Sequence, residues 1–208
     1  MLAYSAQELL VEPFAGLVFA MPPGATTKLA GVQHGGVLLG MLAVAFAASA
    51  IGGPRLGSLR MWTIVGCVTS AAALVAIAAS GIVGAPAPLR AAVFALGVSN
   101  GVFAVAAIGS MMSLAGAGAA SREGTRMGLW GAAQAVAFGL GGFTGTVVVD
   151  VARRFVGTPL TAYDVAFVAE AALFLVAAML ARGIARPRPE PEAPRIALCA
   201  ETSLAAGT

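Results

Sequence analysis

Two acidic residues near the start of the chain have the type and spacing for chemistry inside a membrane. Glu8 and Glu12 lie four residues apart in an apolar stretch, so a helix presents both carboxyl groups on one face. A carboxylate at the bilayer centre costs on the order of 2 to 3 kcal/mol, which predicts that both face a cavity or other protein. Pro13 removes a backbone hydrogen bond beside Glu12 and predicts a helix kink there. One alternative stays open, with Glu8 at the cytoplasmic interface and only Glu12 deep.

Other polar side chains in apolar stretches extend this set of candidate ligand-binding residues, namely Gln33, His34, Asn100, Gln134 and Glu170. His34 is the only histidine, and a neutral imidazole can ligate a metal through one ring nitrogen. A magnesium ion already held in a pigment ring needs only one such axial ligand. His34 is therefore a candidate pigment ligand, with an interhelical hydrogen bond as the alternative. If the first two helices form an antiparallel hairpin, Glu12 and His34 become neighbours.

The sequence lacks the known catalytic constellations. It has no nucleophile–His–acid set, no GxxxxGK[ST] phosphate loop and no HExxH motif. Cys67 in an apolar run and Cys199 in a polar segment exclude a disulfide framework and a cysteine-based metal site. We therefore expect a protein that is not an enzyme and has no metal site of its own.

The elements that position these residues must lie in lipid. Of the 208 residues, 59% are hydrophobic and 10% are charged, whereas an ordinary soluble domain has about 25% charged residues. The net charge of +3 comes from basic residues scattered singly or in pairs, with few aromatic residues among them, which excludes a nucleic-acid partner. The composition predicts an all-α membrane protein.

Apolar stretches of about 20 residues, the length that crosses a bilayer, predict six transmembrane helices. They form a bundle over residues 1–182 and cover residues 2–21, 29–51, 61–83, 89–114, 127–149 and 163–181. Residues 183–208 are rich in proline and alternating charge, which predicts a disordered cytoplasmic tail. The first residues lack the basic start of a signal peptide, so we expect the first span to be retained.

Basic residues near the span ends predict the orientation. Four lie on one side, and these are Lys28, Arg90, Arg153 and Arg154. Eight lie on the side of both termini, and these are Arg55, Arg60, Arg122, Arg126, Arg182, Arg186, Arg188 and Arg195. Because cytoplasmic loops carry the excess of lysine and arginine, both termini are predicted to be cytoplasmic.

Glycines spaced four residues apart recur in the predicted spans. The pairs are Gly31 with Gly35, Gly36 with Gly40, Gly97 with Gly101, Gly124 with Gly128, and Gly141 with Gly145. Each pair places two glycines on one helix face, which lets helices approach closely. Close packing within one bundle is the favoured interpretation over dimerisation, and with 27 glycines some pairs arise by chance.

Six spans with an acidic, proline-containing first helix resemble one half of a major facilitator superfamily transporter, which is built from inverted three-helix repeats. The loop Gly52 to Arg60 takes the place of that superfamily's glycine- and arginine-rich loop, without its aspartate. A more specific resemblance lies in Gln7 to Gly16, QELLVEPFAG, which is similar to the Q-[DE]-x-L-x-E-P-[FY]-[GA]-G motif that opens the C-terminal half of the PucC and LhaA family. The family's G-x-T-[TA] turn is matched by Gly24, Thr26 and Thr27.

Two later stretches also resemble this bacteriochlorophyll-delivery branch of the superfamily, Asn100 to Met112 and Gly128 to Gly142. The resemblance implies a multi-pass protein of the bacterial inner, photosynthetic membrane that binds or delivers bacteriochlorophyll during assembly of light-harvesting antennae. It implies antenna polypeptides as partners. The family has twelve spans, so we expect either a fragment or a half-length chain that pairs with a second six-helix half or another copy of itself.

Three functions compete at this point. The favoured one is a pigment-handling assembly factor. The second is half of a proton-coupled solute transporter, in which Glu12 and Glu170 exchange protons. The third is a structural membrane subunit that holds antenna helices through its glycine faces and binds no small molecule.

Overall fold

The computed structural model describes residues 1–50, 58–116 and 122–183, with side chains described for 1–47, 58–113 and 122–183. Six helices make up these ranges, and they contain no strand. The helices are α1 Leu2–Val18, α2 Pro23–Ala50, α3 Leu59–Val83, α4 Pro86–Gly116, α5 Glu123–Val156 and α6 Pro159–Gly183. The prediction of an all-α membrane protein is confirmed. Most of the loop Gly52 to Arg60, Arg55 included, and the expected tail beyond Gly183 lie outside the described residues.

Five of the helices, α2 to α6, are long and apolar enough to cross a membrane by length and composition. The helix α1 differs from the expected span 2–21 because it has 17 residues and ends at Val18. Its end follows from the sequence, since Ala20 adopts a left-handed φ of 50° and Pro22 and Pro23 follow directly. Each of the other expected spans overlaps one helix, but α2, α4, α5 and α6 begin several residues earlier than expected, and α5 extends seven residues farther, to Val156.

Proline and glycine set these boundaries. Pro23, Pro86 and Pro159 each begin a helix, where the missing N–H has no intrahelical partner to lose. Gly84 and Gly157 end α3 and α5 with φ values of 69° and 71°, a left-handed conformation that glycine adopts without a Cβ clash. The predicted starts fell late because they were placed at apolar residues rather than at the prolines.

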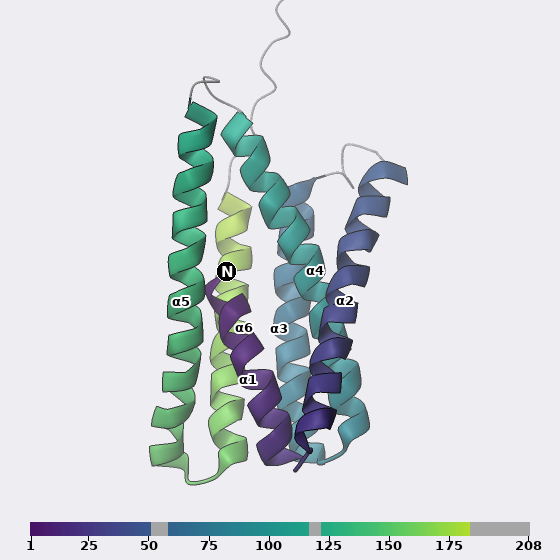
Figure 1. Ribbon diagram of the computed structural model, residues 1–208, viewed down its shortest axis with the longest axis vertical. Helices are drawn as coiled ribbons and strands as arrows, with labels where there is room; N and C mark the ends of the chain where they lie inside the picture. The colour runs from purple at the N-terminus through teal and green to yellow at the C-terminus, as the bar shows by residue number, and fades with distance from the viewer. Residues whose placement is uncertain (51–57, 117–121, 184–208) are drawn as a thin grey trace, which may run out of the picture.

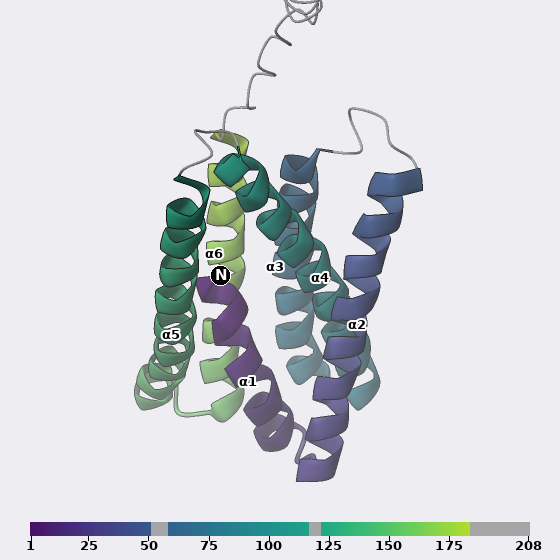
Figure 2. The same ribbon diagram turned by 45° about the horizontal axis from the view of Figure 1, so that its top comes forward.

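Successive helices alternate in direction (Figures 1 and 2). The end of α1, the start of α2 and the turns after α3 and α5 lie at one end of the bundle, and α6 ends at the opposite end. The start of α1 lies midway between the two ends in both views. Glu8 is therefore farther from an end of the bundle than Glu12.

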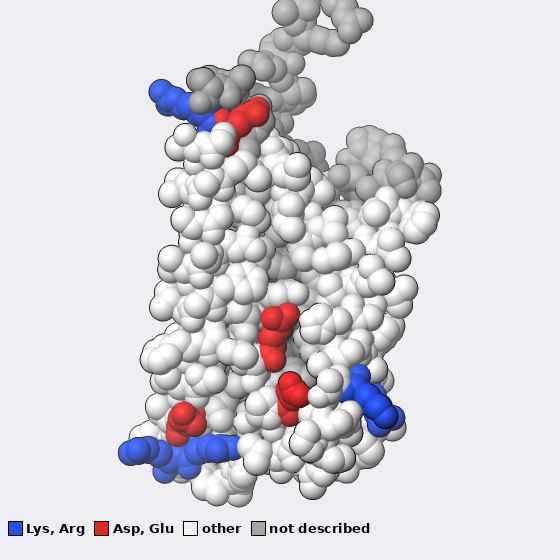
Figure 3. Space-filling view, in the orientation of Figure 1, with Lys and Arg blue, Asp and Glu red and all other residues white. Residues whose placement is uncertain are grey.

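Charged side chains on the face seen in Figure 3 gather at the two ends of the bundle, apart from acidic side chains over α1. Apart from those acidic side chains, the wide band between the ends shows no charged side chain on this face. Large apolar side chains such as Leu38, Phe143 and Leu180 are exposed at the helix surfaces. This distribution is the one that lipid requires, because the apolar middle contacts acyl chains and the charged ends reach water.

Helices pack in a reciprocal pattern. α2 packs on α4, α5 packs on α1, and α3 packs on both α4 and α6. Each of the two three-helix segments therefore places its middle helix against the first helix of the other segment. Because each segment has an odd number of helices, the two run in opposite directions through the bundle, as in the three-plus-three inverted repeat that the resemblance implies.

The contact between α2 and α4 depends on two of the predicted glycine pairs. A Cβ at Gly36 would lie 2.6 Å from the Phe94 carbonyl oxygen, and one at Gly40 would overlap the Val98 carbonyl oxygen. From the other side, a Cβ at Gly97 or Gly101 would overlap a carbonyl oxygen of α2. The two backbones therefore touch directly, which confirms close packing within the bundle for these pairs.

The remaining glycine pairs divide into two kinds. Gly141 and Gly145 on α5 contact α1, where a Cβ at Gly145 would lie 3.0 Å from the Ala6 Cβ. The other two pairs have open space, because a Cβ at any of their glycines meets nothing within 4 Å. These pairs are Gly31 with Gly35 and Gly124 with Gly128. Close packing within the bundle is therefore wrong for these two pairs in the described residues.

Adjacent glycines on α2 allow a matched test of the α2–α4 contact. Gly36→Ala should destabilise the bundle by about 1 to 3 kcal/mol because the helices must separate to admit the methyl group. Gly35→Ala adds the same methyl group to the same helix in open space, so it should leave the melting temperature unchanged or raise it slightly. Thermal unfolding in one detergent compares the two variants, and equal melting temperatures would contradict the direct contact.

Candidate functional site at the seam between α1 and α2

The buried Phe14 sets the rotation of α1. Its side chain has no exposed surface, and its ring lies 5.1 Å from that of Phe167 and 5.6 Å from that of Tyr163, both edge to face. Residues are spaced about 100° apart around a helix, so Glu8 and Glu12 point about 120° to 160° away from Phe14. Both glutamates are exposed as a result.

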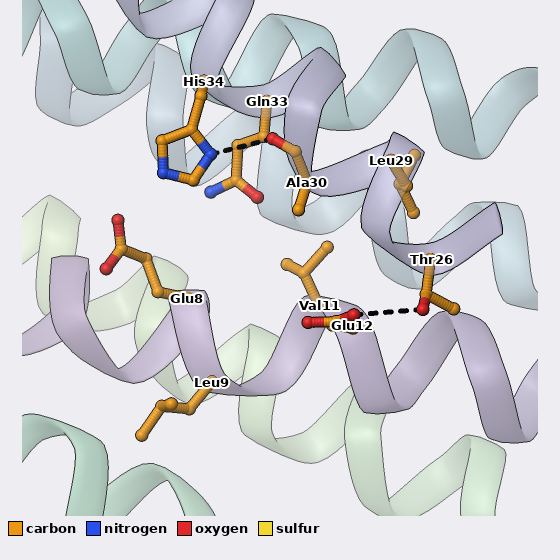
Figure 4. Close-up of a pocket in the computed structure, with 9 residues that line it drawn as sticks. All are labelled: Glu8, Leu9, Val11, Glu12, Thr26, Leu29, Ala30, Gln33 and His34. Atoms are coloured by element: carbon orange, nitrogen blue, oxygen red, sulfur yellow. Dashed lines mark hydrogen bonds between the residues drawn. The ribbon is translucent and has the colours of Figure 1, made fainter. Parts of the chain in front are cut away.

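A pocket of about 260 Å³ lies along the seam between α1 and α2 (Figure 4). It is lined from α1 by Glu8, Leu9, Val11 and Glu12 and from α2 by Thr26, Leu29, Ala30, Gln33 and His34. The predicted residues Glu8, Glu12, Gln33 and His34 thus come together in one place. The seam is open because α2 is held against α4 and makes far less contact with α1.

Glu8, rather than Glu12, faces the histidine. Figure 4 shows the carboxyl group of Glu8 directed at the space beside the His34 ring, with the Gln33 amide next to it. The helix ends explain the difference from the predicted neighbours Glu12 and His34. His34 lies about 17 Å from the start of α2, and Glu8 and Glu12 lie about 15 Å and 9 Å from the end of α1. Glu12 still lines the same pocket.

Glu12 is held by a hydroxyl group of α2. The Thr26 side chain donates a hydrogen bond to Glu12 Oε1 at 3.0 Å, and its oxygen also lies 2.9 Å from the Pro23 carbonyl oxygen. One hydroxyl proton is shared between these two acceptors. The bond ties the end of α1 to the start of α2 and fixes the direction of the Glu12 carboxylate.

The tautomer of His34 follows from its hydrogen bond. Nδ1 lies 2.8 Å from the carbonyl oxygen of Ala30 in the same helix. A carbonyl oxygen only accepts, so in the neutral ring Nδ1 carries the proton and Nε2 keeps its lone pair. The side chain is exposed and lines the pocket. This hydrogen bond lies within α2, so Nδ1 does not make the interhelical hydrogen bond that was the predicted alternative. Within the part of the chain that the structure describes, Nε2 has no hydrogen-bond partner, and the Nδ1 bond sets the ring orientation.

The electrostatic character of the seam is one-sided. The residues that line its pocket include two carboxyl groups and one imidazole and no lysine or arginine. A second pocket of about 400 Å³ adjoins it, shares Glu8, Glu12 and Thr26, and extends to Pro13 and Met21. The predicted kink residue Pro13 therefore lines this second pocket, within a helix that continues to Val18. Together the two pockets form a trough, which offers hydrogen-bond acceptors and possible metal ligands to a molecule with an apolar body.

The other predicted site residues lie elsewhere. Asn100 is fully buried between α3 and α4, where its Oδ1 accepts a hydrogen bond from Ser70 at 3.2 Å. Gln134 is half-buried on α5 and lines none of the pockets described here. Glu170 is buried on α6 and lines a separate pocket with residues of α1 and α5. Three of the seven candidates are thus not part of the seam.

Two residues with a clear place in the structure were not among the predicted site residues. Thr26 was noted only for its match to the G-x-T-[TA] turn, and its position in the first turn of a helix opposite an acidic residue was the available signal. Gln7 is fully buried in α1, and neither polar atom of its side chain has a partner among the described residues. Its position one residue before Glu8 gives no local sign of this burial.

Comparisons with known proteins bear on the whole bundle. A family model described as PUCC protein matches residues 1–188. The "Bacteriochlorophyll synthase 44.5 kDa chain" of Rhodobacter capsulatus is 53% identical over 196 residues, which cover 94% of this chain and 45% of that protein. "Protein PucC" of the same species is 32% identical over 180 residues, 84% of this chain and 37% of that protein.

The "Uncharacterized protein in puhA-bchM intergenic region" of Rhodobacter capsulatus is 30% identical over 203 residues, 89% of this chain and 39% of that protein. No solved structure matches the chain. The chain spans less than half the length of each of these relatives. The family model covers most of the chain, including both helices of the seam, and the chain therefore belongs to the PUCC protein family.

Proposed function

We propose that this membrane protein binds bacteriochlorophyll at the seam between α1 and α2 and hands it over during assembly of light-harvesting antenna complexes. The observation that carries the proposal is the His34 ring, whose Nδ1 is engaged by Ala30 while its other nitrogen is presented to a pocket in the apolar band. The name of one relative, the "Bacteriochlorophyll synthase 44.5 kDa chain", links that protein to bacteriochlorophyll.

The chemistry of the ligand fits a single imidazole. Magnesium in the pigment already has its ring nitrogens as ligands and would need only one further ligand from the protein. Neutral Nε2 supplies that lone pair, and the Nδ1 bond to Ala30 keeps the ring in place, as a partner on the other nitrogen commonly does for metal-ligating histidines. Such a site binds a preformed metal ring without the three or four ligands that a bare ion needs.

The rest of the trough suits the edge of a macrocycle. The side chains of Leu9, Val11 and Leu29 give apolar contact. Gln33 can donate a hydrogen bond from its amide to a ring carbonyl, and the carboxyl groups of Glu8 and Glu12 accept from donors or from water. The open side of the seam lets a rigid ring enter and leave sideways within the membrane, as delivery requires.

The proposed role is that of a carrier and not of an enzyme, because the seam supplies a metal ligand and hydrogen-bonding groups without a nucleophile. We place the protein in the bacterial photosynthetic membrane with both termini cytoplasmic. Its proposed partners are antenna polypeptides and a second six-helix half or another copy of itself. The exposed acidic side chains over α1 then face that second half across the trough (Figure 3).

Loss of the axial ligand should release the pigment. We expect His34→Leu, purified from a pigment-making host, to retain about tenfold less bacteriochlorophyll per protein than the unaltered chain, which corresponds to about 1.4 kcal/mol. Leu42→Ala, at an exposed position two turns farther along α2, should keep its pigment. The measurement is the ratio of bacteriochlorophyll absorbance to protein. A colourless unaltered chain together with pH-gradient-driven solute uptake would favour the transporter function instead.

Adjacent threonines test whether the fixed Glu12 carboxyl group contributes. Thr26→Val removes the hydroxyl that bonds Glu12, and we expect pigment affinity to fall about threefold to tenfold, the range of one ordinary hydrogen bond after solvent compensation. Thr27→Val removes a hydroxyl that is exposed and bonds only the Pro23 carbonyl of its own helix, so its affinity should stay unchanged. Pigment titration into both variants gives the comparison, and equal affinities would remove Glu12 from the site.

A further inference from the structure

A third pocket lies on the opposite side of α1 from the trough, where this helix meets α5 and α6. It has a volume of about 260 Å³ and is lined by Leu2, Ala6, Thr144, Gly145, Val148, Ala166, Ala169, Glu170 and Leu173. Ala6 and Glu8 are two residues apart and so point about 200° apart around α1. The pocket is therefore separate from the seam and shares no lining residue with it.

Glu170 is the one ionisable side chain in this pocket. It is 4% exposed, and neither carboxyl oxygen has a hydrogen-bond partner in the part of the chain that the structure describes. It lies about 17 Å from the start of α6 and about 20 Å from its end, near the middle of the membrane. The pocket contains no basic side chain to neutralise it. A buried polar group left without a partner is unfavourable. Both carboxyl oxygens are enclosed, so the Glu170 side chain would gain a hydrogen bond by turning toward a ligand that enters the pocket.

The other lining groups restrict what can enter. Ala6, Gly145, Ala166 and Ala169 are small and leave a narrow apolar slot. The Thr144 hydroxyl already donates to the Leu140 carbonyl at 2.7 Å, so its proton is engaged. A cation at this depth is costly to desolvate, and the slot offers it a single carboxyl group. A neutral hydroxyl at the end of a long apolar chain satisfies the carboxyl group and fills the slot without that cost.

We propose that the pocket between α1, α5 and α6 binds the hydroxyl end of an isoprenoid or other long-chain alcohol, with Glu170 as its hydrogen-bond partner. The hydroxyl reaches Glu170 through the slot, and the rest of the molecule runs in the lipid along exposed apolar side chains of α5 and α6 such as Val147 and Leu173. This site is independent of the pigment proposal, so either can fail alone.

The test uses all-trans-retinol, a fluorescent isoprenoid alcohol, with the full chain in lipid nanodiscs. Energy transfer from the two tryptophans, Trp62 on α3 and Trp130 on α5, reports binding. We expect saturable binding that weakens at least fivefold in Glu170→Leu and in Ala169→Phe, which fills the slot from an exposed position. Ala172→Phe places the same ring at an exposed position outside the pocket, and Glu12→Gln neutralises a carboxyl group of the seam. Both of these variants should bind retinol normally.

Two further measurements separate a specific hydrogen bond from partition into the slot. Retinol should shift a carboxyl C=O stretching band in infrared difference spectra, and the shift should disappear in Glu170→Gln, which keeps the shape of the side chain. The hydrocarbon analogue of retinol that lacks the hydroxyl should bind at least fivefold more weakly than retinol. Equal binding of alcohol and hydrocarbon, or undiminished binding in both Glu170→Leu and Ala169→Phe, would overturn the proposal and leave water as the partner of Glu170.

Discussion

The direct backbone contact between α2 and α4 is the interaction on which the rest of the bundle depends. Lipid gives helices no hydrophobic drive to associate, so close packing must come from small residues, and four glycines bring these two helices together. Since α2 is fixed to α4, it cannot also lie close along α1, its neighbour in sequence. The seam that results holds both glutamates of α1 and the single histidine. A bulkier α2–α4 contact would move His34 relative to α1 and change the site without altering any residue in it.

Much of this arrangement was predictable from the sequence, because lipid imposes strong and simple patterns. Apolar stretches gave the number and order of the helices, and the glycine pairs of α2 and α4 were recognisable by spacing. What the sequence could not give depends on tertiary contacts. The pairs beginning at Gly31 and Gly124 have the same spacing as that beginning at Gly97, yet they face open space, because only the rotation of the helix decides what a glycine meets.

The site was partly predictable for the same reason. The four-residue spacing of Glu8 and Glu12 placed both on one face, and a hairpin brought them near His34. The prediction paired the histidine with the wrong glutamate because it placed the start of α2 six residues late, nearly two turns of helix. Asn100 and Gln134 show the limit of reasoning from polarity alone, since a polar residue in an apolar span serves packing as readily as binding. Asn100 bonds Ser70 inside the core.

Glu8, Glu12 and Glu170 differ in how the protein meets the cost of a carboxyl group in lipid. Glu12 is bonded by Thr26, and Glu8 faces the open trough. Glu170 is the most enclosed of the three, yet among the described residues its carboxyl group has no hydrogen-bond partner, and it does not face an open trough. Replacing it with an apolar residue would remove an unsatisfied group and fill part of a slot, changes that ordinarily stabilise a core. A residue that opposes stability at its own position is best explained by a ligand that supplies the missing bond, and the small side chains around Glu170 leave the space for one.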